Sequence, residues 1–285
     1  MLIQQITIVG TGLIGGSVGL ALRAQGFAGI IVGCDRPAVL EVAQRRGAID
    51  RGEASLERAL DGSGVILFAT PAGCILSQFE AVAPIIPADA LITDAGSTKQ
   101  QFVERARMVY GSEAHTRVLP GHPMAGKEHS GIENADSNLF HDAAWLVTPI
   151  EPDSPLTDLQ KDWLRLLAAL GARLITIDAE RHDRLCAWVS HLPQMISTAF
   201  ATVLRDELGD DEAVVQVGGR ALREMTRIAH SPYSMWRDIA LTNSENIEEV
   251  LLRFEQQLTY LRENLRGPAL RELFESANKF GREQE

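Results

Sequence analysis

The sequence has few cysteines, no long apolar run and no cluster of basic residues. Its three cysteines, Cys34, Cys74 and Cys186, are scattered along the chain. An odd, scattered set indicates neither a disulfide framework nor a zinc site, so we expect no bound metal. No apolar stretch approaches the ~20 residues that span a bilayer, and the first residues lack the charged region of a signal peptide. We therefore expect a cytoplasmic protein without a membrane partner.

Positive charge is scarce as well. The chain carries 27 Lys and Arg residues against 38 Asp and Glu residues, which gives a formal net charge of -11. Such a charge repels nucleic acid unless a local basic patch overcomes it, and no run of Lys or Arg forms one. The sequence does have 45% hydrophobic residues over 285 positions. That is enough for a sizeable core and, on length, for two domains.

The two parts of the chain differ in pattern. The first part alternates helical stretches with short β-rich runs, which lie at residues 5–9, 30–34, 65–69, 90–93, 117–119, 145–147 and 173–177. This alternation predicts βαβ units in an α/β domain with a mostly parallel sheet of the Rossmann type. Beyond Asp178 the pattern predicts only helices. We therefore expect a dinucleotide-binding domain over residues 1–178 and an all-helical domain over residues 179–285.

One segment of the helical part carries an apolar stripe. Between Ile247 and Leu261, apolar residues recur at the i, i+3, i+4, i+7 spacing of one helix face. Thr242 with Glu245 forms a possible capping box before this helix. Such a stripe suits either ordinary core or an interface between subunits.

A glycine-rich motif follows the first predicted strand. Residues 10–15, Gly-Thr-Gly-Leu-Ile-Gly, match the pattern G-x-G-x-x-G and open a predicted helix. Gly10 allows the tight turn, Gly12 lets a pyrophosphate approach the backbone, and Gly15 lets helix and strand pack closely. The exposed N–H groups at the helix start then bind phosphates. We expect the whole motif to contact a dinucleotide, including Thr11, Leu13 and Ile14.

The end of the second predicted strand bears on the choice of cofactor. Asp35 lies where a carboxylate accepts hydrogen bonds from the adenine ribose, and it would repel the 2′-phosphate of NADP. Arg36 could pair with that phosphate or stack on adenine. NAD is favoured, and NADP stays open. Thr70 and Pro71 end the third predicted strand, at the sheet edge where such folds bind ligands.

Two further segments at strand ends carry candidate catalytic residues. They are DAGSTK at residues 94–99 and GHPMAG at residues 121–126. His122 is a candidate general base because imidazole titrates near neutral pH, and Ser97 could bond that ring and fix its tautomer. Alternatively, His122 is simply a polar residue in a turn. Four other histidines look like ordinary surface or helix-end residues; they are His115, His141, His182 and His230.

These segments resemble the prephenate/arogenate dehydrogenase family of tyrosine biosynthesis. The resemblance covers DAGSTK at residues 94–99, GHPMAGKEHSG at residues 121–131, SHLPQ at residues 190–194 and MWRDI at residues 235–239, in the same order. Relatives often have a second His after Ser-His-Leu-Pro, where this chain has Gln194. With 285 residues we expect no fused regulatory domain.

The resemblance implies a role for each matching residue. His122 takes the proton from the C4 hydroxyl of prephenate as hydride leaves C4 for NAD+, and loss of CO2 then yields 4-hydroxyphenylpyruvate. Ser97 holds His122 and the hydroxyl, Arg237 pairs with a substrate carboxylate, and His191 lines the substrate pocket. The family also implies a homodimer formed through the helical domain, where the apolar stripe lies.

Alternatives remain open from the sequence. Arogenate could be the substrate, alone or together with prephenate as in a cyclohexadienyl dehydrogenase. A β-hydroxyacid dehydrogenase would want a catalytic Lys in the helical part, where only Lys279 occurs. A non-catalytic NAD-binding regulator could lose Ser97, His122 and Arg237 together, and this chain keeps all three.

Overall fold

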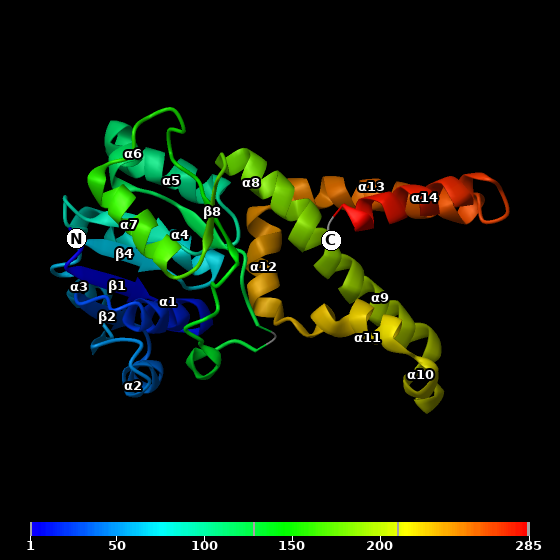
Figure 1. Cartoon of the computed structure of the whole chain (residues 1–285), viewed down its shortest axis with the longest axis horizontal. Coiled ribbons are helices and arrows are strands. Elements are labelled where there is room, and N and C mark those ends of the chain that lie inside the picture. Colours follow the sequence, from blue (N-terminus) through cyan, green and yellow to red (C-terminus); the bar gives the residue numbers. More distant parts are fainter. Residues whose placement is uncertain (1, 128, 210, 284–285) are drawn as a thin grey trace.

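The computed structural model describes residues 2–127, 129–209 and 211–283. Glu128, inside the motif at residues 121–131, lies outside the described residues. An α/β half is followed by a helical half that extends away from it (Figure 1). The predicted α/β class with a helical second part is confirmed.

The main sheet is entirely parallel. Its five strands run in the order β3-β2-β1-β4-β5. Their bounds are β1 Gln5–Val9, β2 Ile30–Cys34, β3 Arg51–Glu53, β4 Val65–Phe68 and β5 Leu91–Asp94. Because the order reverses between β1 and β4, the loops at their carboxyl ends separate and leave a crevice, where ligands of such folds bind. The short β3 was not predicted from the sequence.

Helices cover both faces of this sheet. They are α1 Leu13–Ala24, α2 Pro37–Arg45, α3 Leu56–Leu60, α4 Ala72–Val82, α5 Gln100–Tyr110, α6 Ala114–Arg117 and α7 Asp158–Ala169. Short turns of 3-10 helix add Ala83–Ile85, Gly111–Glu113 and Ile132–Asn134 in this half, and Arg227–His230 in the helical half. The central strands are buried on both faces, which explains their continuous runs of Ile, Val, Leu and Phe.

A second, three-stranded sheet extends the α/β half. It contains β6 Gly121–Pro123, β7 Ala144–Val147 and β8 Arg173–Thr176. β6 is antiparallel to β7, whereas β8 is parallel to it. The strand expected at residues 117–119 is wrong: Val118 makes only an isolated bridge with Ile92, and the strand begins at Gly121. Pro120 has no N–H to donate, which interrupts the pairing between these segments.

The helical half begins after β8. Its elements are α8 Ala179–Cys186, a π-helical turn at Ala187–His191, α9 Leu192–Leu208, α10 Glu212–Val217, α11 Arg220–Thr226, α12 Tyr233–Thr242, α13 Ser244–Glu263 and α14 Ala269–Arg282. Helix α12 packs against α4 of the α/β half. Helices α9 to α11 form one arm and α13 with α14 a second arm, and the two arms diverge (Figure 1).

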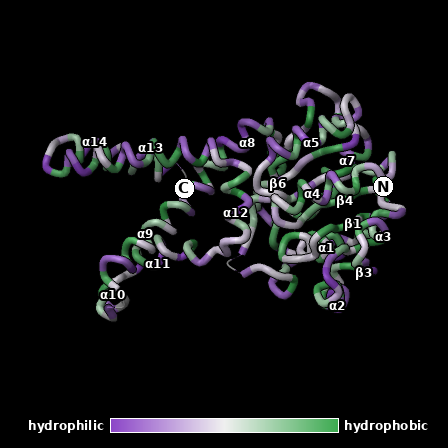
Figure 2. The backbone as a smooth tube through the Cα atoms, turned by 180° about the vertical axis from the view of Figure 1, so that it is seen from behind, coloured by the Kyte–Doolittle hydropathy of each residue, from purple (hydrophilic) through white to green (hydrophobic). Residues whose placement is uncertain are grey.

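The apolar stripe of α13 is only partly buried. Ile247 and Val250 are buried, whereas Leu258 is 50% exposed. The expected capping box is wrong, because the Thr242 hydroxyl donates to the Asp238 carbonyl of α12 at 2.8 Å and Asn243 takes the N-cap position. Hydrophobic and hydrophilic residues alternate along both arms (Figure 2). No helix within the described ranges has the length and hydropathy to cross a membrane.

Candidate active site

A cavity of about 600 Å³ lies between the two halves. The carboxyl ends of β1, β4, β5 and β6 form one wall, and Ser190 with residues of α12 forms the other. Of the predicted site residues, the lining includes Gly12, Leu13, Ile14, Thr70, Pro71, Ser97 and His122. The fold therefore brings the glycine motif and both catalytic candidates to one cavity.

The glycine motif has the conformation that the sequence predicts. Gly10 turns with a φ of +92°, and a Cβ there would lie 2.7 Å from Thr70 Cγ2. A Cβ at Gly15 would collide with the carbonyl oxygen of Gly10. A Cβ at Gly12 would meet no atom within 4 Å, and Gly12 lines the cavity. Its backbone is therefore open to a phosphate, as the motif requires.

Asp35 lies at the carboxyl end of β2 and holds the glycine motif. One carboxylate oxygen accepts from the Thr11 amide at 2.9 Å, and the other accepts from the Arg36 amide at 2.7 Å. Arg36 extends into solvent with its side chain 86% exposed. Asp35 thus lies beside the glycine turn as expected, and the exposed Arg36 pairs with it, with Nε 3.9 Å from Oδ1 of Asp35.

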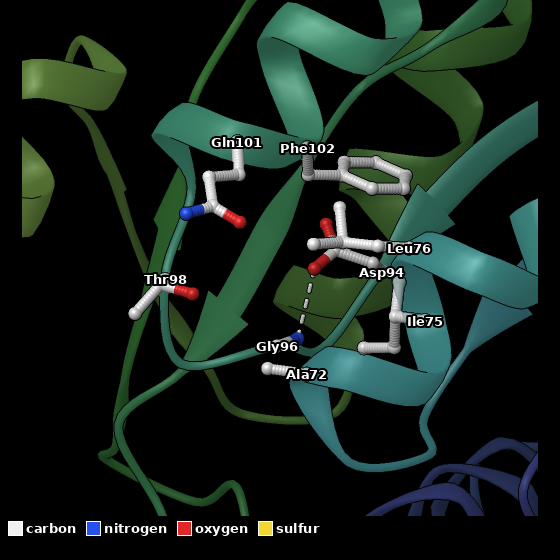
Figure 3. Close-up of a pocket in the computed structure, with 8 residues that line it drawn as sticks. All are labelled: Ala72, Ile75, Leu76, Asp94, Gly96, Thr98, Gln101 and Phe102. Atoms are coloured by element: carbon white, nitrogen blue, oxygen red, sulfur yellow. Dashed lines mark hydrogen bonds between the residues drawn. The ribbon is translucent and has the colours of Figure 1, made fainter. Parts of the chain in front are cut away.

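The loop after β5 is fixed by buried charge. Asp94 accepts from the Gly96 amide at 2.9 Å, beside a small pocket between α4 and α5 (Figure 3). Lys99 is fully buried, pairs with Asp94 and donates to the Gly121 carbonyl at 2.7 Å. Burial raises the pKa of Asp94, whereas the Lys99 ammonium lowers it. This pair ties the loop that carries Ser97 to the start of β6.

A chain of buried polar groups lies behind His122. The His122 Nδ1 atom is 2.9 Å from Nε2 of His182, and Nδ1 of His182 is 2.8 Å from Oδ1 of Asp183. Asp183 also accepts from the backbone amides of Lys99 at 2.7 Å and Gln100 at 2.9 Å. The sequence interpretation of His182 as an ordinary surface or helix-end residue is wrong, because α8 packs its side chain to 0% exposure.

The hydrogen bonds that link Asp183, His182 and His122 determine which nitrogen of His122 can accept a proton. The Asp183 carboxylate accepts the Nδ1 proton of His182, so the neutral His182 ring presents a bare Nε2. That atom accepts the Nδ1 proton of His122, which leaves Nε2 of His122 with the lone pair. Burial lowers the pKa of His122 well below 6.5, and His182 and Lys99 lower it further. His122 is therefore neutral at physiological pH.

Ser97 lies in the cavity wall with His122, but it does not orient the ring. Within the described part of the chain, Ser97 makes no hydrogen bond to His122. The ring is held by His182 instead. The sequence gives no signal that singles out His182, because its contact with His122 joins residues sixty positions apart.

His191 is buried beneath the cavity. It is 1% exposed, and its Nδ1 atom lies 3.2 Å from Nδ2 of Asn243. Burial lowers the pKa of His191 to about 4. Its neighbour Ser190 and the edge-on ring of Trp236 line the cavity in its place. The indole Nε1 of Trp236 is buried without a hydrogen-bond partner among the described residues.

Arg237 lies outside the cavity lining. Its side chain is 52% exposed, and Nη2 lies 2.7 Å from Oδ1 of the buried Asp238. A second cavity of about 560 Å³ adjoins the first, with Gly126, Lys127 and Ser231 common to both. Basic side chains gather there; the lining includes Lys127, His129, Arg227 and His230.

Comparisons with known proteins extend this picture. The family model described as "Prephenate dehydrogenase, nucleotide-binding domain" matches residues 18–176, and the one described as "Prephenate dehydrogenase, dimerization domain" matches residues 178–278. The chain belongs to the prephenate dehydrogenase family. This confirms the predicted family and, with it, a nicotinamide-dependent oxidoreductase.

Individual members of the family are similar over most of the chain. A prephenate dehydrogenase of Lactococcus lactis is 33% identical over 90% of this chain and 69% of its own length. A cyclohexadienyl dehydrogenase of Zymomonas mobilis is 26% identical, over 91% of this chain and 87% of its own length.

Two solved structures share the fold from end to end. The prephenate dehydrogenase of Aquifex aeolicus, in complex with hydroxyphenyl propionate and NAD+, has a TM-score of 0.89 and 30% identity, and the match covers 100% of this chain and 98% of that one. The arogenate dehydrogenase of Synechocystis has a TM-score of 0.78 and 28% identity, with 99% and 100% covered.

Proposed function

We propose that the protein is an NAD-dependent prephenate dehydrogenase that converts prephenate to 4-hydroxyphenylpyruvate and CO2. The observation that carries this proposal is His122, a neutral base whose Nε2 lone pair lies at the cavity that also contains the glycine motif. A base beside a nicotinamide site suits oxidation of an alcohol. The named relatives act on cyclohexadienyl substrates of this kind.

The residues present fit NAD. Gly12 leaves its backbone open to a pyrophosphate, and Asp35 stands where the ribose hydroxyls would lie. When bound, the nicotinamide supplies the hydride acceptor. The protein must then hold the substrate, take one proton and exclude water. We propose that His122 Nε2 accepts the C4 hydroxyl proton, after which loss of CO2 makes the ring aromatic.

We further propose that His182 and Asp183 are positioning residues for this step. As His122 gains its proton, the charged ring still donates from Nδ1 to His182, whose own tautomer is fixed by Asp183. Asp183 cannot rotate away because two backbone amides hold it. The ring thus keeps its orientation before and after proton transfer.

Binding of the dianionic substrate needs local cations, because the protein as a whole is negative. We propose Arg237 for one carboxylate, as the family resemblance implies. The Asp238 carboxylate contacts Nε and Nη2 of the Arg237 guanidinium, so the other N–H groups of Arg237 remain for the substrate. Lys127 is the competing candidate, because it lines both cavities.

Arogenate is the second candidate substrate. The Synechocystis arogenate dehydrogenase has the same fold over its full length, which favours a cavity that also admits an amino group. We also propose a homodimer formed through residues 179–285, in line with the description of the second family model. The domain limit at residue 178, a cytoplasmic location and the absence of nucleic-acid or membrane partners stay predictions from the sequence.

A direct assay tests the function. The purified protein is mixed with NAD+ and either prephenate or arogenate, and the absorbance of the reduced nicotinamide is followed while the product is identified by mass. We expect turnover of prephenate and a much smaller rate with the His122→Asn variant. Turnover of arogenate alone would replace the substrate, and no turnover of either would reject the proposal.

A further inference from the structure

Three potential metal ligands meet behind the cavity. His182 and Cys186 lie one turn apart on α8, and His122 reaches them from β6. Cys186 Sγ is 3.9 Å from His122 Nδ1 and 3.7 Å from His182 Nε2, and those two nitrogens are 2.9 Å apart. All three side chains are buried. The expectation of no metal rested on cysteine spacing, which cannot show ligands contributed by two different elements.

We propose that this cluster is an inhibitory site for a thiophilic divalent cation such as Zn²⁺. Tetrahedral zinc holds nitrogen at about 2.0–2.1 Å and sulfur at about 2.3 Å, which separates two nitrogens by about 3.4 Å and nitrogen from sulfur by about 3.6 Å. The separations in the structure differ from these by about 0.5 Å or less. Small rotations of three side chains therefore suffice, and water can complete the tetrahedron.

The surroundings already have the form of a metal site. A histidine that binds zinc through one nitrogen usually donates its other N–H to a carboxylate, and His182 does so to Asp183. Two backbone amides fix that carboxylate in turn. The nearby Lys99 ammonium is paired with Asp94, which limits its repulsion of a cation.

Binding exchanges a proton for the metal ion. Burial raises the pKa of Cys186 to about 12, so without metal the group is a thiol. The cation takes the thiolate and displaces its proton, and the Nδ1 proton of His122 moves to Nε2, so one proton is released for each ion bound. Affinity is accordingly lower than at an exposed thiolate site, and it increases with pH.

The tautomer shift explains the inhibition, and this step rests on the proposed function. A neutral imidazole carries one N–H. Once Nδ1 binds the metal, that N–H must be on Nε2, the atom that would accept the substrate proton. The base is lost while the glycine motif, which follows β1 and contributes no ligand to the cluster, is unchanged. We therefore expect the ion to lower kcat and to leave the KM for NAD+ unaffected.

Metal binding is tested first, without reference to activity. A Cys34→Ser/Cys74→Ser variant leaves Cys186 as the only thiol, and it is titrated with Co²⁺, whose bond to a thiolate gives a near-ultraviolet charge-transfer band. We expect one equivalent of Co²⁺ to produce the band, Zn²⁺ to displace it, and further replacement by Cys186→Ser or Cys186→Ala to abolish it. Absence of the band, or a band that survives both replacements, would overturn the site.

The effect of the ion on activity is measured second. Zn²⁺ should lower kcat at least tenfold, EDTA should reverse the loss, and Cys186→Ser should raise the Zn²⁺ concentration needed by about 10-fold or more, whereas Cys74→Ser should not. Asp183→Asn should weaken Co²⁺ binding by about 10–100-fold, the usual worth of such a carboxylate. A stoichiometric Co²⁺ band with unchanged kcat would retain the site and reject His122 as the base.

Discussion

At the scale of single residues, Asp35 combines two tasks. Its carboxylate holds the Thr11 amide at 2.9 Å and stands where a ribose would bind. A carboxylate there gains a charge-assisted hydrogen bond with NAD and faces repulsion from the 2′-phosphate of NADP. We therefore propose that the residue that holds the glycine turn also selects the cofactor, and this proposal predicts the effect of its removal.

Asp35→Ala should narrow the preference for NAD over NADP by about tenfold or more, the scale of one charge-assisted hydrogen bond. The ratio of kcat/KM values for the two cofactors measures it. Because Arg36 is exposed and able to reach a phosphate, Arg36→Gln is the matched control and should not relax the preference. A native enzyme that prefers NADP would make Arg36 the governing residue.

His122 predicts the pH profile. The base must be neutral, so activity is present above its pKa and is lost as the pH falls through it. Burial, His182 and Lys99 lower that pKa well below 6.5, so we expect the acidic limb of kcat/KM to lie below the ordinary range of histidine. His122→Asn should lower kcat by about 10²–10⁴ with a much smaller change in KM, and it should remove the limb.

Ser97→Ala serves as the comparison. Since Ser97 lines the cavity but makes no hydrogen bond to the ring, the variant should lose less activity than His122→Asn and should keep the acidic limb. If His122→Asn keeps near-normal kcat and an intact limb, the base is another group.

Arg237 and Lys127 can be separated by kinetics. Arg237→Gln removes the guanidinium fork and should raise the KM for prephenate about tenfold or more, with the KM for NAD+ unchanged. The effect should fall short of a fully buried pair because the side chain is 52% exposed. Lys127→Gln is the parallel variant. A rise in KM with Lys127→Gln alone would move the carboxylate site to the second cavity.

The sequence predicts local features of the site and misses those created by distant packing. Gly10, Gly12 and Gly15 could be assigned because one turn contains the whole arrangement. His182 could not be ranked, since its burial depends on how α8 packs against β6, about sixty positions earlier in the chain. The sequence predicts that Ser97 orients the His122 ring, whereas in the structure His182 makes that contact. The reason is that proximity along strand ends does not determine side-chain geometry.

At the scale of elements, α12 joins the two halves. Asp238 on α12 accepts from the Gly73 amide at the start of α4 at 3.2 Å, and the hydroxyls of Thr98 and Thr242 lie 2.8 Å apart. Met235 and Trp236 of the same helix line the cavity. The position of this wall relative to the cofactor side therefore depends on a few polar contacts.

Asp238→Ala should loosen this joint. The variant leaves Arg237 unpaired and one α4 amide without its acceptor, so the free energy of unfolding should fall by about 1–2 kcal/mol. Because α4 follows Thr70 and Pro71 in the cavity wall, KM should rise for both prephenate and NAD+. Denaturant unfolding and initial rates measure these effects. Arg237→Gln should raise the KM for prephenate alone. If both variants raised the KM for NAD+ equally, the two residues would not have distinct roles.

At the scale of the whole molecule, the two halves differ in how much they bury. Large buried clusters cover both faces of the main sheet. Among the described residues, the cluster of the helical half has three buried members, Ala187, Leu192 and Val250. Helix α14 has no buried residue among those described, and its Phe274 and Phe280 are 62% and 66% exposed. The sequence could not separate core from interface in this half, because an apolar stripe is the same in both.

The exposed apolar residues of the arms predict a dimer. Burying a Phe side chain contributes about 1.5–3 kcal/mol, and each subunit supplies Phe274 and Phe280 on α14 as well as Val203 on α9 and Leu252 on α13. We expect light scattering at micromolar concentration to give twice the 31.1 kDa of one chain. Thermal unfolding should also shift to higher temperature as the protein concentration increases, because association stabilises only the folded state.

Charge on this surface should separate the subunits. Phe274→Glu with Phe280→Glu should shift the protein toward a monomer and lower its unfolding temperature, since buried carboxylates without partners oppose association. The control is Met108→Glu on α5, where an even more exposed apolar side chain (73%) belongs to the α/β half; it should leave the dimer intact. A native protein of 31.1 kDa across this concentration range would contradict the prediction. The exposed apolar residues of the two arms would then have to be buried against a different partner.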